Sequence, residues 1–148
     1  MNNYFADKEF IASSKAKELG IDNTPDAATW ERLHALRDKI LNPARYHLGR
    51  AIYITSGYRC PQLNAAVGGA ADSQHVKGEA VDITTRSLAK NRDLFRILVQ
   101  LGNFDQLIWE NGGDWIHVSY RPFARGEMLS FDGNYYTNIN NNWQTAIV

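Results

Sequence analysis

Apolar side chains recur at helical spacing through the first third of the chain. One helix is predicted over residues 7–19, with Asp7 as a good N-cap and Gly20 as the stop. A second helix is predicted to begin at Thr24-Pro25, as N-cap and first helical residue, and to end at Asn42-Pro43. The residues of these helices expected to face the core are Phe10, Ile11, Leu19, Trp30, Leu33, Leu36 and Ile40.

Further along, the pattern changes to the two-residue alternation typical of half-buried strands. Strands are predicted at 51–55 and 79–84, with a short helix at 61–67 between them. The clearest amphipathic helix of the chain follows at 87–101, because its apolar residues fall on one side and Gly102 closes it. The chain therefore mixes helices and strands without the regular strand–helix–strand repetition of a parallel sheet.

Two hairpins are predicted in the last third of the chain. The first joins 104–110 to 115–120 around Asn111-Gly112-Gly113, and the second joins 127–131 to 134–137 around Asp132-Gly133. The Asn-rich tail at 138–148 is expected to be peripheral. We predict an α+β fold with N-terminal helices packed on a small antiparallel sheet. It forms a single domain, 1–148, with its core at about 4–125 and a C-terminal hairpin and tail at 126–148.

Charge and cysteine content narrow the function classes. The 16 Lys and Arg residues balance the 16 Asp and Glu residues, so the basic excess of a nucleic-acid-binding domain is missing and no nucleic-acid partner is expected. A neutral or zwitterionic substrate fits better. The single cysteine, Cys60, excludes an internal disulfide and a cysteine metal cluster.

The N-terminal residues lack the basic and apolar regions of a signal peptide. No segment approaches the ~18 apolar residues needed to cross a bilayer, so no membrane insertion is expected. We expect a monomer in the cytoplasm of the producing cell, which other factors would have to deliver to any substrate outside.

The residue types with the clearest chemistry are two histidines and an aspartate, His75, Asp82 and His117. Asp82 shares its predicted strand face with the small Ala80, which leaves room for an ion. If the two strands pair, Asp82 and His117 converge on one surface of the sheet. Two imidazoles and one carboxylate, with a fourth position open for water, are the ligand set of a catalytic zinc site.

A metal-activated water also needs a general base. Asp114 lies three residues before His117, in the turn that enters the strand, and is the preferred base. Glu110 is the rival, although it lies seven residues before His117, across the predicted turn.

Arg59 and Ser73 are the expected substrate contacts. A guanidinium near a zinc site can hold a substrate carboxylate or stabilise the tetrahedral oxyanion, so Arg59 is also a candidate catalytic residue. Ser73 could hydrogen-bond a substrate carbonyl or carboxylate. Each residue also has an ordinary alternative, a surface salt bridge for Arg59 and a turn or cap for Ser73.

Several motifs together resemble the zinc D-Ala-D-Ala carboxypeptidase and phage L-alanyl-D-glutamate endolysin family. They are Ser-x-His-x-x-Gly-x-Ala-x-Asp at 73–82, Trp-x-His at 115–117, Ser-Gly-Tyr-Arg at 56–59 and the opening Tyr-Phe-x-x-Lys-Glu-Phe at 4–10. The resemblance covers roughly residues 4–121. Where this chain has Asp114, many members have Glu, and the shorter side chain requires a closer approach to the water.

The resemblance implies a Hedgehog/DD-peptidase-like fold and hydrolysis of peptide bonds in peptidoglycan stem peptides. Carried over position by position, it makes His75, Asp82 and His117 the Zn²⁺ ligands and Asp114 the catalytic carboxylate, with Arg59 and Ser73 on the substrate. The reaction would be D-Ala-D-Ala carboxypeptidase or endolysin-type endopeptidase cleavage, and the small size suggests a phage or prophage protein. The alternative is a non-catalytic zinc-containing domain that binds peptidoglycan or serves as a phage structural part.

Overall fold

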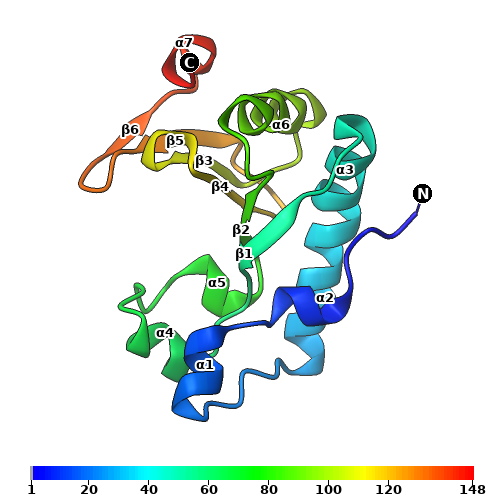
Figure 1. The fold of residues 1–148 in the computed structure, drawn as a ribbon, viewed down its shortest axis with the longest axis vertical. Helices are drawn as coiled ribbons and strands as arrows, with labels where there is room; N and C mark the ends of the chain where they lie inside the picture. The colour runs from blue at the N-terminus through cyan, green and yellow to red at the C-terminus, as the bar shows by residue number, and fades with distance from the viewer. Residues whose placement is uncertain (1) are drawn as a thin grey trace.

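A six-stranded sheet, in the order β1-β2-β4-β3-β5-β6, is the centre of the computed structural model, which describes residues 2–148 (Figure 1). Neighbouring strands are antiparallel except β3 and β5, which are parallel. The strands are β1 (Tyr53–Ser56), β2 (Ala80–Thr84), β3 (Gln106–Glu110), β4 (Trp115–Ser119), β5 (Glu127–Phe131) and β6 (Tyr136–Asn138).

The α+β architecture and both hairpins are confirmed, but the purely antiparallel sheet is wrong at one pair. After β4 the chain reverses through residues 120–126 and crosses to the far side of β3. Because β4 is antiparallel to β3, a strand that runs back along the other edge of β3 must be parallel to it. Alternation within a strand predicts its faces and carries no information about which strand lies beside it.

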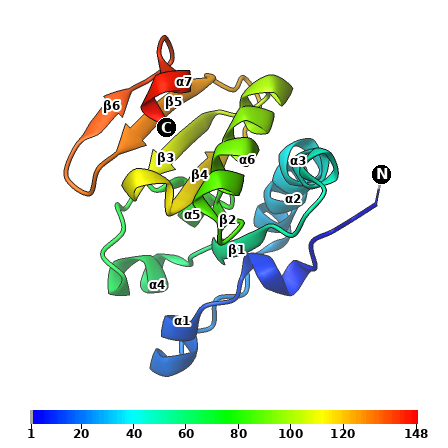
Figure 2. The same ribbon diagram turned by 45° about the horizontal axis from the view of Figure 1, so that its top comes forward.

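The two faces of the sheet have different chemistry. One face, the core face, is apolar and fully buried, and α6 (Leu88–Leu101) lies against it (Figure 1 and Figure 2). Phe95 of α6 meets Trp109 of β3 edge to face, with ring centroids 5.6 Å apart. The strand residues of the core face are Val81, Ile83, Leu107, Trp109, Ile116 and Val118. The opposite face, the cleft face, holds the alternate residues and is largely polar.

The second predicted helix is longer than expected. It consists of α2 (Ala27–Leu36), a π-helical turn (Arg37–Leu41) and α3 (Asn42–Leu48), which follow one another and end at Gly49. Pro43 lacks an N–H, and in a regular helix its ring would collide with the carbonyl four residues earlier. The wider π turn just before it accommodates the proline, so the helix continues through the predicted end.

The first predicted helix is divided. Asp7–Phe10 form a 3₁₀ turn, and α1 (Ser14–Leu19) begins separately, capped by the Ser13 hydroxyl, which accepts a hydrogen bond from the Ala16 N–H at 3.1 Å. Leu19, expected in the core, is 49% exposed. The cap of α2 is also shifted, from Thr24 to Asp26, whose carboxylate accepts from the Thr29 N–H. Local capping chemistry therefore outweighs apolar spacing in these short helices.

The C-terminal tail is not peripheral. Ile139 and Ile147 are fully buried, and α7 (Trp143–Ala146) places Trp143 against Phe95 of α6 with ring centroids 6.2 Å apart. The Arg92 Nε of α6 donates to the Ile147 carbonyl at 2.9 Å. The apolar residues of this tail are too widely spaced to form a periodic pattern, which is why the sequence did not reveal their packing. No helix within residues 2–148 is long and apolar enough to span a bilayer.

Candidate metal centre

His75 is presented by α5 (Gln74–Lys77), a single helical turn capped by Ser73, whose hydroxyl accepts from the His75 N–H at 3.2 Å. The His75 ring is buried, and its Nδ1 lies 2.8 Å from the Gly57 carbonyl oxygen. A carbonyl can only accept, so Nδ1 carries the proton and donates. The lone pair of Nε2 therefore remains for a ligand, and this atom lies 3.4 Å from Asp82 Oδ1.

Two glycines make room for this arrangement. A Cβ on Gly57 would lie 2.2 Å from the Phe10 carbonyl oxygen, so only glycine lets the 3₁₀ turn approach the segment that holds His75. Gly78 ends α5 with φ of +73°, and a Cβ there would lie 2.6 Å from Thr29 Cγ2. The glycine of the Ser-x-His-x-x-Gly motif is thus required for the sharp turn from α5 into β2.

Asp82 and His117 face one another across the β2–β4 pair. They are register partners in the antiparallel ladder, and His117 Nδ1 lies 3.2 Å from Asp82 Oδ1. The two strands pair, which was the condition set from the sequence, and the two side chains converge on one face of the sheet as expected in that case. The rings of His75 and His117 are 5.2 Å apart and meet edge to face.

The geometry of this cluster fits a metal ion. The three ligand atoms of His75, Asp82 and His117 all lie within 4.8 Å of one another. Around a tetrahedral zinc ion with bonds of ~2.1 Å, ligand atoms are separated by about 3.4 Å, close to the 3.4 and 3.2 Å measured from Asp82. The pKa of Asp82 lies well below its usual value: burial raises it, but the adjacent imidazoles of His117 and His75, when protonated, lower it further. The carboxylate is thus ionised, as a ligand must be.

An open cleft of about 580 Å³ lies above these three residues. The segment before α5, which follows α4 (Pro61–Ala66), forms one side of the cleft. The cleft face of β3 and the segment after β4 form the other side. The charged or polar residues around it are Arg59, Asp72, Ser73, Gln74, Lys77, Gln106, Glu110, Arg121, Arg125 and Tyr136. A polar, open cleft of this kind suits an extended polar ligand such as a peptide.

Glu110 is the carboxylate that the fold brings to the cleft beside the metal cluster. It ends β3 on the face of Ile108, whose register partner is His117, so Glu110 lies on the same face as that ligand. Glu110 is only 8% exposed. Burial and the nearby negative charge of Asp82 raise the pKa of Glu110 to about 7, with His75 acting in the opposite direction.

Asp114, the preferred base in the sequence, is not brought to the cleft. Its side chain is exposed, does not line the cleft, and accepts a hydrogen bond from Asn111 Nδ2 at 2.8 Å within the β3–β4 turn. Asp114 lies outside β4, with helical backbone angles at the end of the turn, so its side chain is held within the turn. The register of the hairpin, in which Glu110 pairs directly with Trp115, places Glu110 on the face of His117, and the sequence alone did not give this register.

Arg59 and Ser73 both line the cleft, as expected of substrate contacts. The Arg59 Nη2 donates to the Ser73 hydroxyl at 3.4 Å, while its Nε is buried and has no hydrogen-bond partner within residues 2–148. Burial lowers the pKa of Arg59, and the charge of Asp82 partly offsets this effect. Ser73 therefore has two roles already, as the cap of α5 and as a support for Arg59.

A comparison with protein families gave a match. The Peptidase M15 family matches the chain over residues 3–119, a range that includes the three metal-cluster residues, Arg59, Ser73 and both candidate bases, Glu110 and Asp114. The match ends before Arg121, Arg125 and Tyr136, which also line the cleft. A search of curated proteins gave no match.

Proposed function

Because the chain belongs to the peptidase M15 family, whose members are metal-dependent peptidases, we propose that it is a zinc-dependent hydrolase of peptidoglycan stem peptides. The observation that carries the proposal is the cluster of two imidazoles and one carboxylate, whose ligand atoms lie within 4.8 Å of one another, in an open cleft that also holds a buried carboxyl group. Zinc is the metal that this donor set suits best, because both neutral imidazole and carboxylate are its common ligands.

In this proposal His75 Nε2, Asp82 Oδ1 and His117 Nδ1 hold the ion. Bound zinc would polarise the scissile carbonyl and lower the pKa of a water molecule beside it. The residues around it supply the proton transfers and the charge stabilisation. They also decide which peptide enters the cleft.

Glu110 is the general base and acid in this proposal, in place of Asp114. Its carboxylate accepts a proton from the attacking water and returns it to the leaving amine. The pKa of about 7 applies without a cation. Next to a bound dication this pKa would fall, so that Glu110 is ionised and can accept a proton at neutral pH. Arg59, oriented by Ser73, donates hydrogen bonds to the developing negative charge on the carbonyl oxygen.

The test compares two carboxylates at opposite ends of the β3–β4 turn. Glu110→Gln should keep one zinc per chain and lower the rate of fragment release from purified peptidoglycan about 10²- to 10⁴-fold, the usual contribution of a general base. Asp114→Asn should keep the zinc and stay within about twofold of wild type, because its side chain is exposed and away from the cleft. A large loss in Asp114→Asn, with Glu110→Gln unaffected, would return the base role to Asp114.

The same digest tests which bond is cut. Free D-alanine among the products indicates a carboxypeptidase, whereas new amino termini within the stem indicate an endopeptidase. A zinc-loaded protein that binds peptidoglycan and releases neither product would favour the non-catalytic binding domain. The buried Glu110 beside the metal cluster supports the enzyme, because a binding domain has no use for a carboxyl group held out of water.

A further inference from the structure

A second buried carboxylate lies along the same cleft, outside the metal cluster. Asp105, directly before β3, has a side chain with no exposed surface. Its Oδ1 lies 3.1 Å from Arg121 Nε, and its two oxygens accept from Arg125 Nε at 3.0 Å and from Arg125 Nη2 at 2.9 Å. Gln74 Nε2 donates to Oδ2 at 2.9 Å. We call these four residues, Gln74, Asp105, Arg121 and Arg125, the Asp105 cluster.

One carboxylate in this cluster holds two guanidinium groups, so their positive charge is only half compensated by Asp105. The Asp105 cluster turns its cations, not its anion, toward the cleft, because Arg121 and Arg125 line it and Asp105 does not. Glu127 lies 3.9 Å from Arg125 Nη1, so Arg121 carries the less compensated charge. The side chains of Arg121 and Arg125 are 37% and 45% exposed, which leaves N–H groups accessible to a ligand.

The Asp105 cluster is tied to the metal cluster at a fixed spacing. Gln74 directly precedes the ligand His75 in α5, and its amide reaches across to Asp105. Arg125 is further held by its own backbone N–H, which donates to Asp105 Oδ1 at 3.0 Å. The two arginines therefore do not sample the cleft freely. They are prepositioned in the wall of the cleft that also holds the three ligands, which lowers the entropic cost of binding an anion.

The two arginines follow the segment that matches the peptidase family, which ends at residue 119. They come from the connection 120–126, which carries the chain from β4 to β5 and produces the parallel strand pair. This part of the cleft wall is therefore a feature of this chain that the family match does not describe.

We propose that Arg121 and Arg125 form a carboxylate-binding subsite that selects peptides with an ionised carboxylate close to the scissile bond. The planar guanidinium presents paired N–H donors that match a carboxylate, and such charge-assisted pairs are stronger than neutral hydrogen bonds. A substrate amide in place of that carboxylate offers the arginines one acceptor atom and no charge. The inference rests on the proposed function and deepens it, because it names the substrate class as acidic rather than amidated stem peptides.

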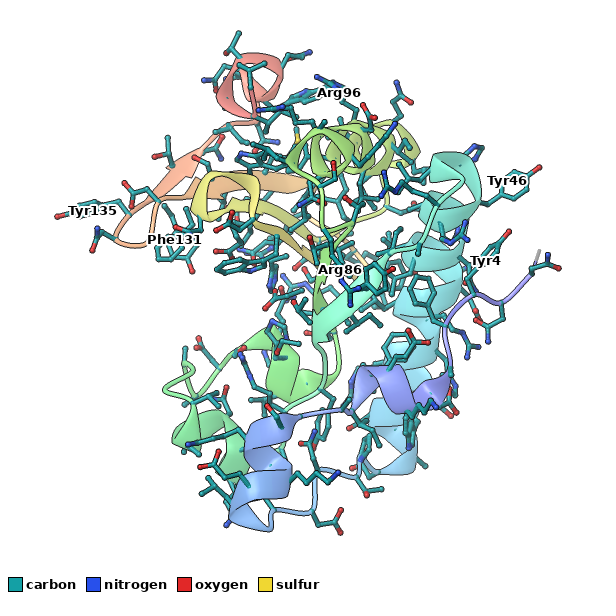
Figure 3. All side chains as sticks on the ribbon, in the orientation of Figure 1. Tyr4, Tyr46, Arg86, Arg96, Phe131 and Tyr135 are labelled. Atoms are coloured by element: carbon teal, nitrogen blue, oxygen red, sulfur yellow. The ribbon has the colours of Figure 1, made fainter. Side chains whose placement is uncertain are left out.

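The test uses two synthetic stem peptides that differ only in one group next to the scissile bond, a free carboxylate or its primary amide. The wild type should prefer the carboxylate in kcat/KM by about tenfold, the size expected for one charge-assisted contact. Arg121→Gln should lose most of this preference, chiefly through slower cleavage of the carboxylate peptide. The control is Arg96→Gln on α6 (Figure 3), a similarly exposed arginine that pairs with Asp93 and should leave both rates unchanged.

Failure of the subsite and failure of the proposed function give different results. If the wild type cleaves both peptides equally well, or Arg121→Gln keeps the wild-type preference, the subsite inference is wrong, but the proposed peptidase function is still supported. If the wild type cleaves neither peptide and the zinc-loaded Glu110→Gln protein binds neither peptide in calorimetry, the proposed function is wrong. The subsite inference is then wrong as well, because it rests on that function.

Discussion

Asp82, which lines the cleft, and Asp105, which lies behind its wall, are both largely buried carboxylates, and both have a pKa well below the usual value. Their partners differ in kind. Two imidazoles surround Asp82, and an imidazole can lose its proton and bind a metal. Two guanidiniums surround Asp105, and these stay charged and offer only N–H donors. The partners, rather than the carboxylate, decide which of the two can be a metal ligand and which can only anchor cations.

The largest effect expected from this difference is loss of the metal. His75→Ala removes one of three ligands and should abolish stoichiometric zinc binding and lower peptidase activity by about a thousandfold or more. Gln74→Ala, one residue earlier, removes a hydrogen bond to Asp105 and no metal ligand, so it should keep one zinc per chain. Zinc content and kcat/KM, measured on both variants, test whether the metal cluster and the Asp105 cluster act independently. Equal zinc loss in the two would mean that the clusters are not independent.

Asp105→Asn should act on stability instead. It removes the buried charge that accepts hydrogen bonds from two half-exposed guanidiniums and from Gln74, which we expect to cost about 2 kcal/mol of unfolding free energy. Zinc content should remain that of the wild type. Asp93→Asn is the matched control, because Asp93 also pairs with an arginine and a lysine but on the exposed side of α6, and it should cost less than about 0.5 kcal/mol. Denaturant titration of both variants measures the difference.

A third carboxyl group, Glu110, forms no ion pair with residues 2–148, and its pKa is raised to about 7 by burial and by Asp82. In metal-free protein the folded state then holds this proton more tightly than the unfolded state, so Glu110 makes the fold less stable as pH rises from about 4.5 to 7. The unfolding free energy of Glu110→Gln should therefore rise relative to that of the wild type by about 3 kcal/mol between the two ends of this pH window. Denaturant unfolding of both proteins with a chelator, at pH 4.5 and at pH 8, measures this change. If the variant and the wild type differ by the same unfolding free energy at both pH values, Glu110 is solvated.

The smallest effect concerns Arg121. Its ion pair with Asp105 is more than a third exposed on the arginine side, and Arg125 still occupies both carboxylate oxygens when Arg121 is removed. Arg121→Gln should therefore cost less than about 1 kcal/mol of unfolding free energy, whatever it does to substrate preference. A loss similar to that of Asp105→Asn would show that Arg121 is needed for folding rather than for binding.

The two hairpins show which part of the fold can be predicted from the sequence. Turn residues at Asn111-Gly112-Gly113 and Asp132-Gly133 predicted both hairpins, and both are confirmed. The β5–β6 hairpin also places Phe131 in a stack with Tyr136, at 4.3 Å between ring centroids, and Tyr136 lines the cleft (Figure 3 shows Phe131 and Tyr135 on this hairpin). The pairing of β5 with β3 was not predictable from turn chemistry, because it depends on how the chain crosses the sheet.

The sequence by itself determined the residues of the metal cluster. His75 and Asp82 are positioned by a turn whose glycine and cap are local, and alternation gives Asp82 and His117 one face each, so their motifs identified the candidate ligands. The pairing of β2 with β4, which brings Asp82 opposite His117, is a long-range contact that the sequence left as a condition. Only the tertiary structure decided which carboxyl group lies in the cleft, since Glu110 and Asp114 are both close to His117 in sequence and the hairpin register separates them. It also decided the Asp105 cluster and the buried tail, because long-range packing brings together residues that no local pattern connects.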